Sequence, residues 1–158
     1  MTGKEQAMSL QALSLTLVAL LAGGLIALQA PINAEAASRL GHPVAAAALS
    51  FCVGTTALIV LTLLFARHSA QLETLKSLPL YMLIGGGLLG ALYVTVNIML
   101  APRIGIAALM ALGIAGQLFT ALLIDRFGLF ELVERGLTVG RVSGALLVLV
   151  GALMVRSL

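Results

Sequence analysis

The chain has 158 residues, of which 61% are hydrophobic and 9% are charged. Soluble domains carry about 25% charged residues, and a domain of this size has too little interior to hide so much apolar surface. The composition therefore excludes an ordinary soluble protein and makes the bilayer the natural surroundings of the chain. The net charge of +3 comes from a few residues spread over loops. Nucleic-acid binding needs a clustered basic face, so we expect no nucleic-acid partner.

The first predicted helix covers residues 8–38. Residues 8–30 carry no charge and would extend about 34 Å as a helix, which exceeds a hydrocarbon core of about 30 Å. A cleaved signal peptide is the alternative interpretation, although the apolar run is longer than a signal core and further runs follow. Pro31 removes a helical hydrogen bond and predicts a kink between Gln29 and Asn33.

Four more charge-poor runs follow, and they predict helices over residues 43–66, 79–101, 104–125 and 138–156. Between the first two helices, Gly41 suits a helix end and Pro43 a helix start. The last run has an uncharged part of only 14 residues, about 21 Å. It spans the membrane if Arg141 and Arg156 extend to the two surfaces, and an interfacial helix is the alternative. We therefore predict an all-α membrane protein with five transmembrane helices in one domain, residues 1–158.

Small residues recur at helical spacing, which favours close approach of helices in lipid. The residues that form such faces are Ala47, Ser50, Gly54 and Ala57 in the second run, Gly86 and Gly90 in the third, and Gly140, Gly144 and Gly151 in the last. We expect these faces to pack against other helices, in the same chain or in a partner.

The distribution of basic residues predicts the orientation. With five spans, one side collects Lys4, Arg67, Lys76, Arg126, Arg135 and Arg141, and the other collects Arg39, Arg103 and Arg156. Basic residues accumulate on the cytoplasmic side of membrane proteins, so six against three favours a cytoplasmic N-terminus.

Amide side chains form the strongest candidate site. Gln29 and Asn33 are four residues apart and share a helical face, while Tyr93 and Asn97 share a stripe of the third run with Gly86 and Gly90. The first and third spans leave the membrane on the same side, so these four polar residues should lie at one depth. Buried amides in lipid need partners, and two readings stay open. The amides either bind a small solute directly or join one helix to another.

Three further polar residues have candidate roles. Gln117 is nearer the middle of the fourth span and either binds the solute or joins helices. Glu35 points away from Gln29, and it forms either a surface ion pair with Arg39, four residues on, or a proton or cation coupling site. Asp125, followed by Arg126, is interpreted as an interface anchor.

The sequence offers no set of residues for catalysis or for metal binding. It has no Ser–His–Asp arrangement, no Gly-rich phosphate loop and no His/Cys cluster. Its single Cys52 can form neither an intrachain disulfide nor a cysteine metal site, and we interpret it as a small buried hydrophobe. We expect neither an enzyme, nor a cofactor, nor a metal.

Three stretches resemble the drug/metabolite transporter superfamily, whose repeat has the EamA-like fold. They are GGLIALQAPINAEAASRLGHPVAAAALSFCVGT across the first two runs, GGLLGALYVTVNIMLAPRIGIAALMALGIAGQLFTALLIDRFGLFE across the next two, and GRVSGALLVLVGALMV in the last. With its QAPINA and APRIG turns the chain most resembles a branch of short five-helix, YdcZ-like proteins. The resemblance implies a single five-helix repeat in the bacterial inner (plasma) membrane and transport of a small molecule.

The chain departs from one group of relatives. The small multidrug-resistance proteins keep an acidic residue in the membrane part of their first helix, whereas here no acid precedes Glu35 in that span. An antiporter that uses a central carboxylate is therefore doubtful. Larger members of the superfamily carry two inverted five-helix repeats, which implies that this chain pairs head to tail.

We therefore predict a secondary transporter of a small polar or amphipathic molecule. It would act by alternating access in an antiparallel homodimer, or in a pair with a homologous five-helix chain. The alternatives are a passive channel and a non-transporting membrane subunit.

Overall fold

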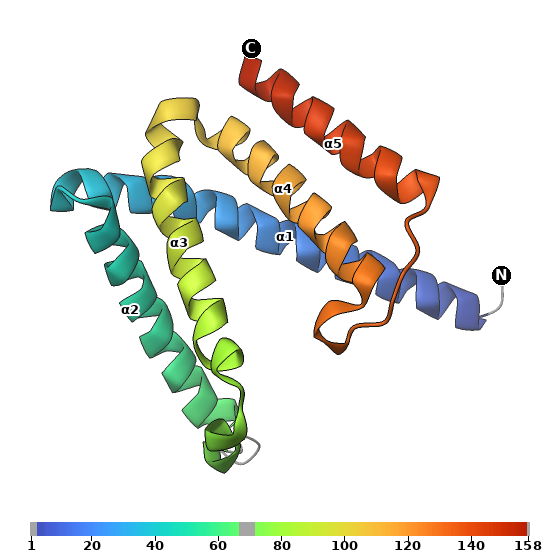
Figure 1. Cartoon of the computed structure of the whole chain (residues 1–158), viewed down its shortest axis with the longest axis horizontal. Helices are drawn as coiled ribbons and strands as arrows, with labels where there is room; N and C mark the ends of the chain where they lie inside the picture. Colours follow the sequence, from blue (N-terminus) through green and yellow to red (C-terminus); the bar gives the residue numbers. More distant parts are fainter. Residues whose placement is uncertain (1–2, 67–71, 158) are drawn as a thin grey trace. The chain divides into compact units, whose positions relative to one another are not determined.

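A computed structural model describes residues 3–66 and 72–157 of the chain (Figure 1). Within these ranges the secondary structure is helical and contains no strand, which confirms the predicted all-α class. Five of the described helices are long and apolar enough to cross a membrane: α1 (Gly3–Leu40), α2 (Pro43–Leu61), α3 (Leu80–Ile104), α4 (Ile106–Phe127) and α5 (Val139–Ser157). Short helical turns cover Thr62–Ala66, Leu72–Ser77 and Leu129–Glu131. Arg67, which enters the count of basic residues, lies outside the described ranges.

The chain forms two compact units, one ending at Met99 and the other starting at Leu100. The first unit contains α1, α2 and most of α3. The second contains the end of α3, α4 and α5.

The turn between α1 and α2 follows from three consecutive residues. Gly41 has a φ of +77°, a left-handed conformation that ends α1 and that a residue with a Cβ adopts only with strain. His42 is the N-cap of α2, and its Nδ1 accepts a hydrogen bond of 3.2 Å from the Val44 N–H. Pro43 takes the first helical position, where its missing N–H costs nothing.

Small residues make the packed part of the first unit. Ala37 of α1, Ala46 and Ala47 of α2 and Ile98 of α3 form one buried cluster. A second close contact joins α2 to α3, because a Cβ built on Gly90 would lie 3.2 Å from the Cζ of Phe51. These residues allow the helices to approach closely.

α3 continues past the predicted boundary at residue 101 and ends at Ile104, with Pro102 inside it. Pro102 has no N–H, so the Ile98 carbonyl lacks its usual helical donor, yet the helix continues to Ile104. Gly105, with a φ of +78°, then turns the chain, and its N–H still bonds the Ala101 carbonyl at 3.1 Å.

In the second unit, α4 and α5 pack side by side. Their buried residues are Ala108, Leu109, Ala115 and Leu122 on α4, and Ala145 and Ala152 on α5. Gly128 ends α4 in a left-handed conformation, and its N–H bonds the Ile124 carbonyl. Alanines at the contact let the two helices lie close together.

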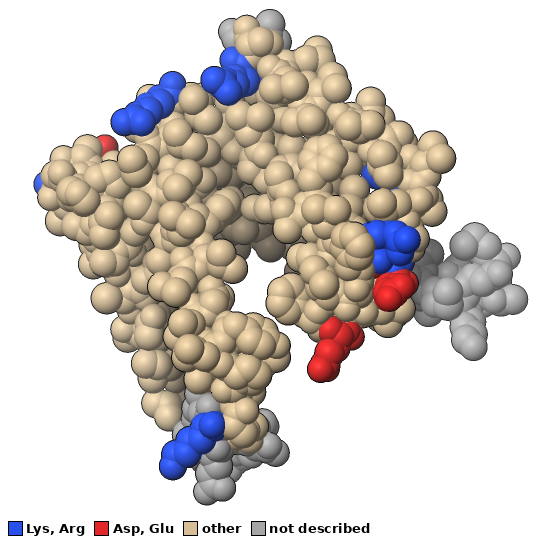
Figure 2. All heavy atoms as spheres, viewed as in Figure 1, with Lys and Arg blue, Asp and Glu red and all other residues tan. Residues whose placement is uncertain are grey.

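The surface is that of a membrane protein. The buried hydrophobic residues are mostly alanines, whereas large apolar side chains such as Leu20 and Leu21 are about 70% exposed. The face shown in Figure 2 is largely uncharged, with a few small groups of acidic and basic residues. Cys52 is also exposed on α2, so the interpretation of it as a buried residue is wrong.

Candidate functional site

Three amide side chains converge on one small cavity within the first unit. We call this space the amide cavity. It measures about 10 Å³, enough for about one water molecule. It is lined by Ile26, Gln29, Ala30 and Asn33 of α1 and by Val94, Asn97 and Ile98 of α3.

Helical periodicity explains this convergence. On α1, residues 26, 29, 30 and 33 follow the spacing of three and four residues that defines one face, and residues 94, 97 and 98 do the same on α3. Pro31 lies between Gln29 and Asn33 without interrupting α1. Its ring leaves the Ala27 carbonyl without the usual helical donor.

The three amides differ in burial. Asn33 is only 7% exposed and is the one polar or charged residue that is buried in the described part of the chain. Asn97 is half-buried, and Gln29 is exposed. Among the described residues, no hydrogen bond joins any of these three side chains to a protein partner. An amide in an apolar setting gains by hydrogen bonding, so these groups suit a solute or water that can both donate and accept.

A larger groove adjoins the amide cavity. We call it the α2 groove. Its volume is about 210 Å³, and its lining is Gln29, Ser50, Phe51, Gly54, Thr55, Leu58 and Val94. Because Gln29 and Val94 line both spaces, the amide cavity and the α2 groove meet at these two residues.

Tyr93 does not line either space. Tyr93 is 37% exposed, whereas the adjacent Val94 lines both the amide cavity and the α2 groove. One residue along a helix changes the direction of a side chain by about 100°, so Tyr93 and Val94 point to different sides of α3. Gln117 lies on α4 in the second unit and is exposed there.

Glu35 forms the surface ion pair that its spacing allows. Its Oε1 lies 2.8 Å from the Arg39 Nε, and the two side chains are 63% and 79% exposed. Glu35 is not among the residues that line the amide cavity. In residues 3–66 and 72–157, no group of three or more His, Cys, Asp or Glu side chains could hold a metal ion.

Sequence reasoning missed the contribution of α2 to this region. Ser50 and Gly54 were recognised as members of a small-residue face, but Thr55 and Phe51 were not singled out. The sequence did contain a signal for this groove. Ser50 and Gly54 are small and leave space beside α2, and Ser50 and Thr55 add hydroxyl groups.

Taken together, the described helices and the lipid-type surface define a multi-pass integral membrane protein. Residues 14–154 match the family described as "Putative inner membrane exporter, YdcZ", and the chain belongs to this family. This match confirms the resemblance to the YdcZ-like branch of the drug/metabolite transporters and the location in the inner membrane. Neither a search of the curated proteins nor a search of the solved structures gave a match.

Proposed function

We propose that the chain is a secondary transporter that exports a small, uncharged, amphipathic or polar molecule across the inner membrane. The observation that carries this proposal is the convergence of Gln29, Asn33 and Asn97 on one cavity with no hydrogen-bond partner among the described residues. The family description supports export as the direction.

The two adjoining spaces suggest the chemical class of the solute. The amide cavity offers groups that donate and accept hydrogen bonds, and the α2 groove offers Phe51, Leu58 and Val94 to an apolar part. No acidic or basic side chain lines either space. A cation held there would lose its hydration without a countercharge, so an uncharged solute fits better.

The remaining candidates, Tyr93, Gln117 and Glu35, line neither the amide cavity nor the α2 groove. Tyr93 and Gln117 stay candidates for solute contact in another state of the transport cycle. Proton or cation coupling through Glu35 is disfavoured, because this carboxylate is exposed and already paired with Arg39.

The working unit in this proposal is an antiparallel homodimer, or a pair with a homologous five-helix chain, with the N-terminus of one chain in the cytoplasm. Five helices are few to enclose a cavity with a gate at each end. A Cβ built on Gly54, Gly86, Gly144 or Gly151 would meet no atom within 4 Å, so these small-residue faces have space for a partner helix. A two-fold axis in the membrane plane would make inward-open and outward-open states equal in energy.

Cross-linking tests the assembly. Cysteines replace Arg39 or Lys76, both exposed, in a Cys52→Ser background, and impermeant reagents label or join them. An antiparallel pair joins position 39 of one protomer to position 76 of the other on one side of the membrane. Links only between identical positions, on separate sides, would mean a parallel dimer.

The transport proposal is tested with Asn33→Leu and Asn97→Leu. Cells that overproduce the wild-type chain should accumulate a solute in the medium, detected by untargeted mass spectrometry, and each variant should lower this export at least tenfold. The matched control is Thr95→Val, since Thr95 lies on α3 but bonds the Ala91 carbonyl at 2.8 Å and does not line the cavity. Thermal unfolding of the purified variants checks that their folds are retained.

Three results separate the alternatives. Normal export by both leucine variants would assign the amides to helix packing. Flux into proteoliposomes that never saturates would indicate a channel. Absence of flux together with a stable complex with another protein would indicate a non-transporting subunit.

A further inference from the structure

The segment that joins α4 to α5 exposes an unusual amount of apolar surface. We call residues 128–138 the connector. Its exposed large apolar residues are Leu129, Phe130, Leu132, Val133 and Leu137, with Phe130 and Val133 exposed to 67% and 79%. A connector surrounded by water on all sides would carry mainly polar side chains, so this surface calls for a partner.

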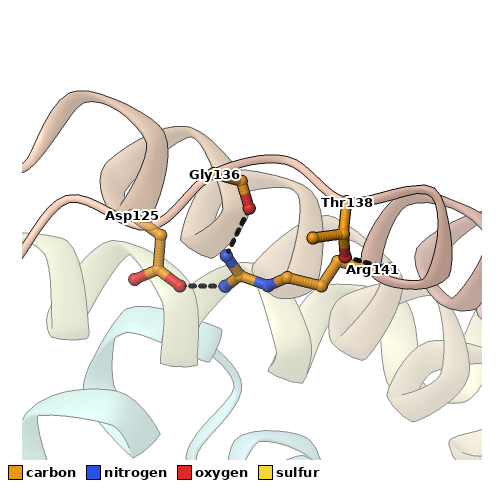
Figure 3. A network of polar contacts seen from close by, with 4 residues as sticks. All are labelled: Asp125, Gly136, Thr138 and Arg141. Atoms are coloured by element: carbon orange, nitrogen blue, oxygen red, sulfur yellow. Dashed lines mark hydrogen bonds and ion pairs between the residues drawn. The ribbon is translucent and has the colours of Figure 1, made fainter.

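Several polar contacts hold the connector against the ends of the helices (Figure 3). Arg141 pairs with Asp125 of α4, and its Nη1 donates to the Gly136 carbonyl at 3.3 Å. The Arg135 N–H donates to the Asp125 carbonyl at 2.8 Å. The Asp125 and Arg141 side chains are 29% and 32% exposed, so this pair is less accessible than that of Glu35 and Arg39. The connector is therefore a built structure with its apolar side chains facing outward.

The backbone of the connector is also strained at one of its exposed apolar residues, Phe130. Phe130 and Glu131 have φ values of 60° and 62°, a left-handed conformation that costs energy for residues other than glycine. If the Phe130 side chain were solvated, no burial of its ring would offset the energy of this backbone conformation. It is consistent with a Phe130 ring that finds an apolar environment outside the protein.

The bilayer is the partner that the surroundings of the connector favour. The connector joins the ends of two membrane spans. On either side of it, Phe127 at the end of α4 and Val139 at the start of α5 are 63% and 87% exposed. Its apolar side chains are thus continuous with the lipid-facing surface. The uncharged part of α5 extends only about 21 Å, which is less than the thickness of the hydrocarbon core. An apolar connector before α5 lengthens the apolar segment at the start of this helix.

We propose that the connector is a membrane-interface loop, with Phe130 and Val133 inserted among the lipids at the headgroup boundary. The Asp125–Arg141 pair ties it to the two helices. The charged residues of the connector are Glu131, Glu134 and Arg135, a slight excess of negative charge. Attraction to anionic lipids therefore does not drive insertion, which should be equally strong in neutral and anionic bilayers. This inference is independent of the solute and of the transport mechanism.

Tryptophan fluorescence tests the proposal directly, because the chain has no tryptophan. Phe130→Trp and Val133→Trp are reconstituted in phosphatidylcholine vesicles with and without phosphatidylglycerol. The control is Lys76→Trp, at an exposed position in the polar connection between α2 and α3. Both connector variants should emit at shorter wavelength than the control. Lipids brominated near the glycerol end of the acyl chains should quench them several-fold more than the control, with the reverse order for aqueous acrylamide.

Three outcomes overturn the proposal. Emission and acrylamide quenching equal to those of the control mean a solvated loop, and protection from both quenchers means that protein covers the surface. Insertion that needs phosphatidylglycerol contradicts the hydrophobic basis. If Phe130→Trp does not fold, Val133→Trp decides alone, since Val133 does not have a positive φ.

Discussion

Removing the ion pair between Asp125 and Arg141 should destabilise the chain more than removing any exposed pair. Its side chains are about one-third exposed. Fully exposed pairs contribute about 0.2–1 kcal/mol, and breaking a fully buried pair costs about 3–5 kcal/mol. We therefore expect a coupling energy of about 1–2 kcal/mol between the two side chains. Arg141→Ala should cost somewhat more than Asp125→Ala, because it also removes the hydrogen bond to the Gly136 carbonyl.

The chain contains a matched control for this measurement. Glu35 and Arg39 form an ion pair on α1 with side chains 63% and 79% exposed. A pair at this helical spacing and exposure is worth about 0.3–0.5 kcal/mol. The two pairs therefore differ mainly in burial and in whether they join different helices.

Double-mutant cycles on both pairs give the coupling energies. Each cycle uses two single alanine variants and the double variant, and the free energy of unfolding is measured in mixed micelles by titration with a denaturing detergent. High salt should reduce the Glu35–Arg39 coupling more than the Asp125–Arg141 coupling, because exposed charges are screened more strongly. An Asp125–Arg141 coupling no larger than that of the control pair would refute this reasoning.

Two further predictions use the same unfolding assay. Gly90→Val should destabilise the chain by about 1–3 kcal/mol, because even a Cβ at Gly90 lies 3.2 Å from Phe51, whereas Gly86→Ala, in open space, should change stability by less than about 1 kcal/mol. Equal effects at the two glycines would contradict the close contact between α2 and α3. His42→Ala should cost about 1 kcal/mol through loss of the α2 N-cap, and His42→Asn should restore most of it. An equal loss in both variants would mean that capping is not the cause.

The membrane class and the helices could be predicted from the sequence because they depend on local properties. Apolar runs without charge define the spans, and Gly41 and Pro43 mark the turn between α1 and α2 by their backbone preferences. The pairing of Gln29 with Asn33 also follows from helical spacing alone.

The residues that line the cavity and the contacts of the connector could not be predicted, because they depend on how the helices pack against one another. A spacing rule accepts Tyr93 and Val94 almost equally as neighbours of Asn97, and only the rotation of α3 against α1 decides that Val94 lines the cavity. In the same way, nothing local indicates that Asp125 bonds a residue 16 positions away, because that contact requires the folded connector.

The sizes of the two spaces constrain the proposed transport cycle. At about 10 Å³, the amide cavity holds about one water molecule, while the adjoining α2 groove measures about 210 Å³. A solute with a polar group larger than water can therefore reach Asn33 and Asn97 only if α1 and α3 separate. Pro31 lies in α1 between Gln29 and Asn33, where the missing backbone hydrogen bond makes bending easiest. In this cycle a bend at Pro31 would move Asn33 relative to Gln29, so that opening the cavity and changing the hydrogen bonds to the solute would be one event.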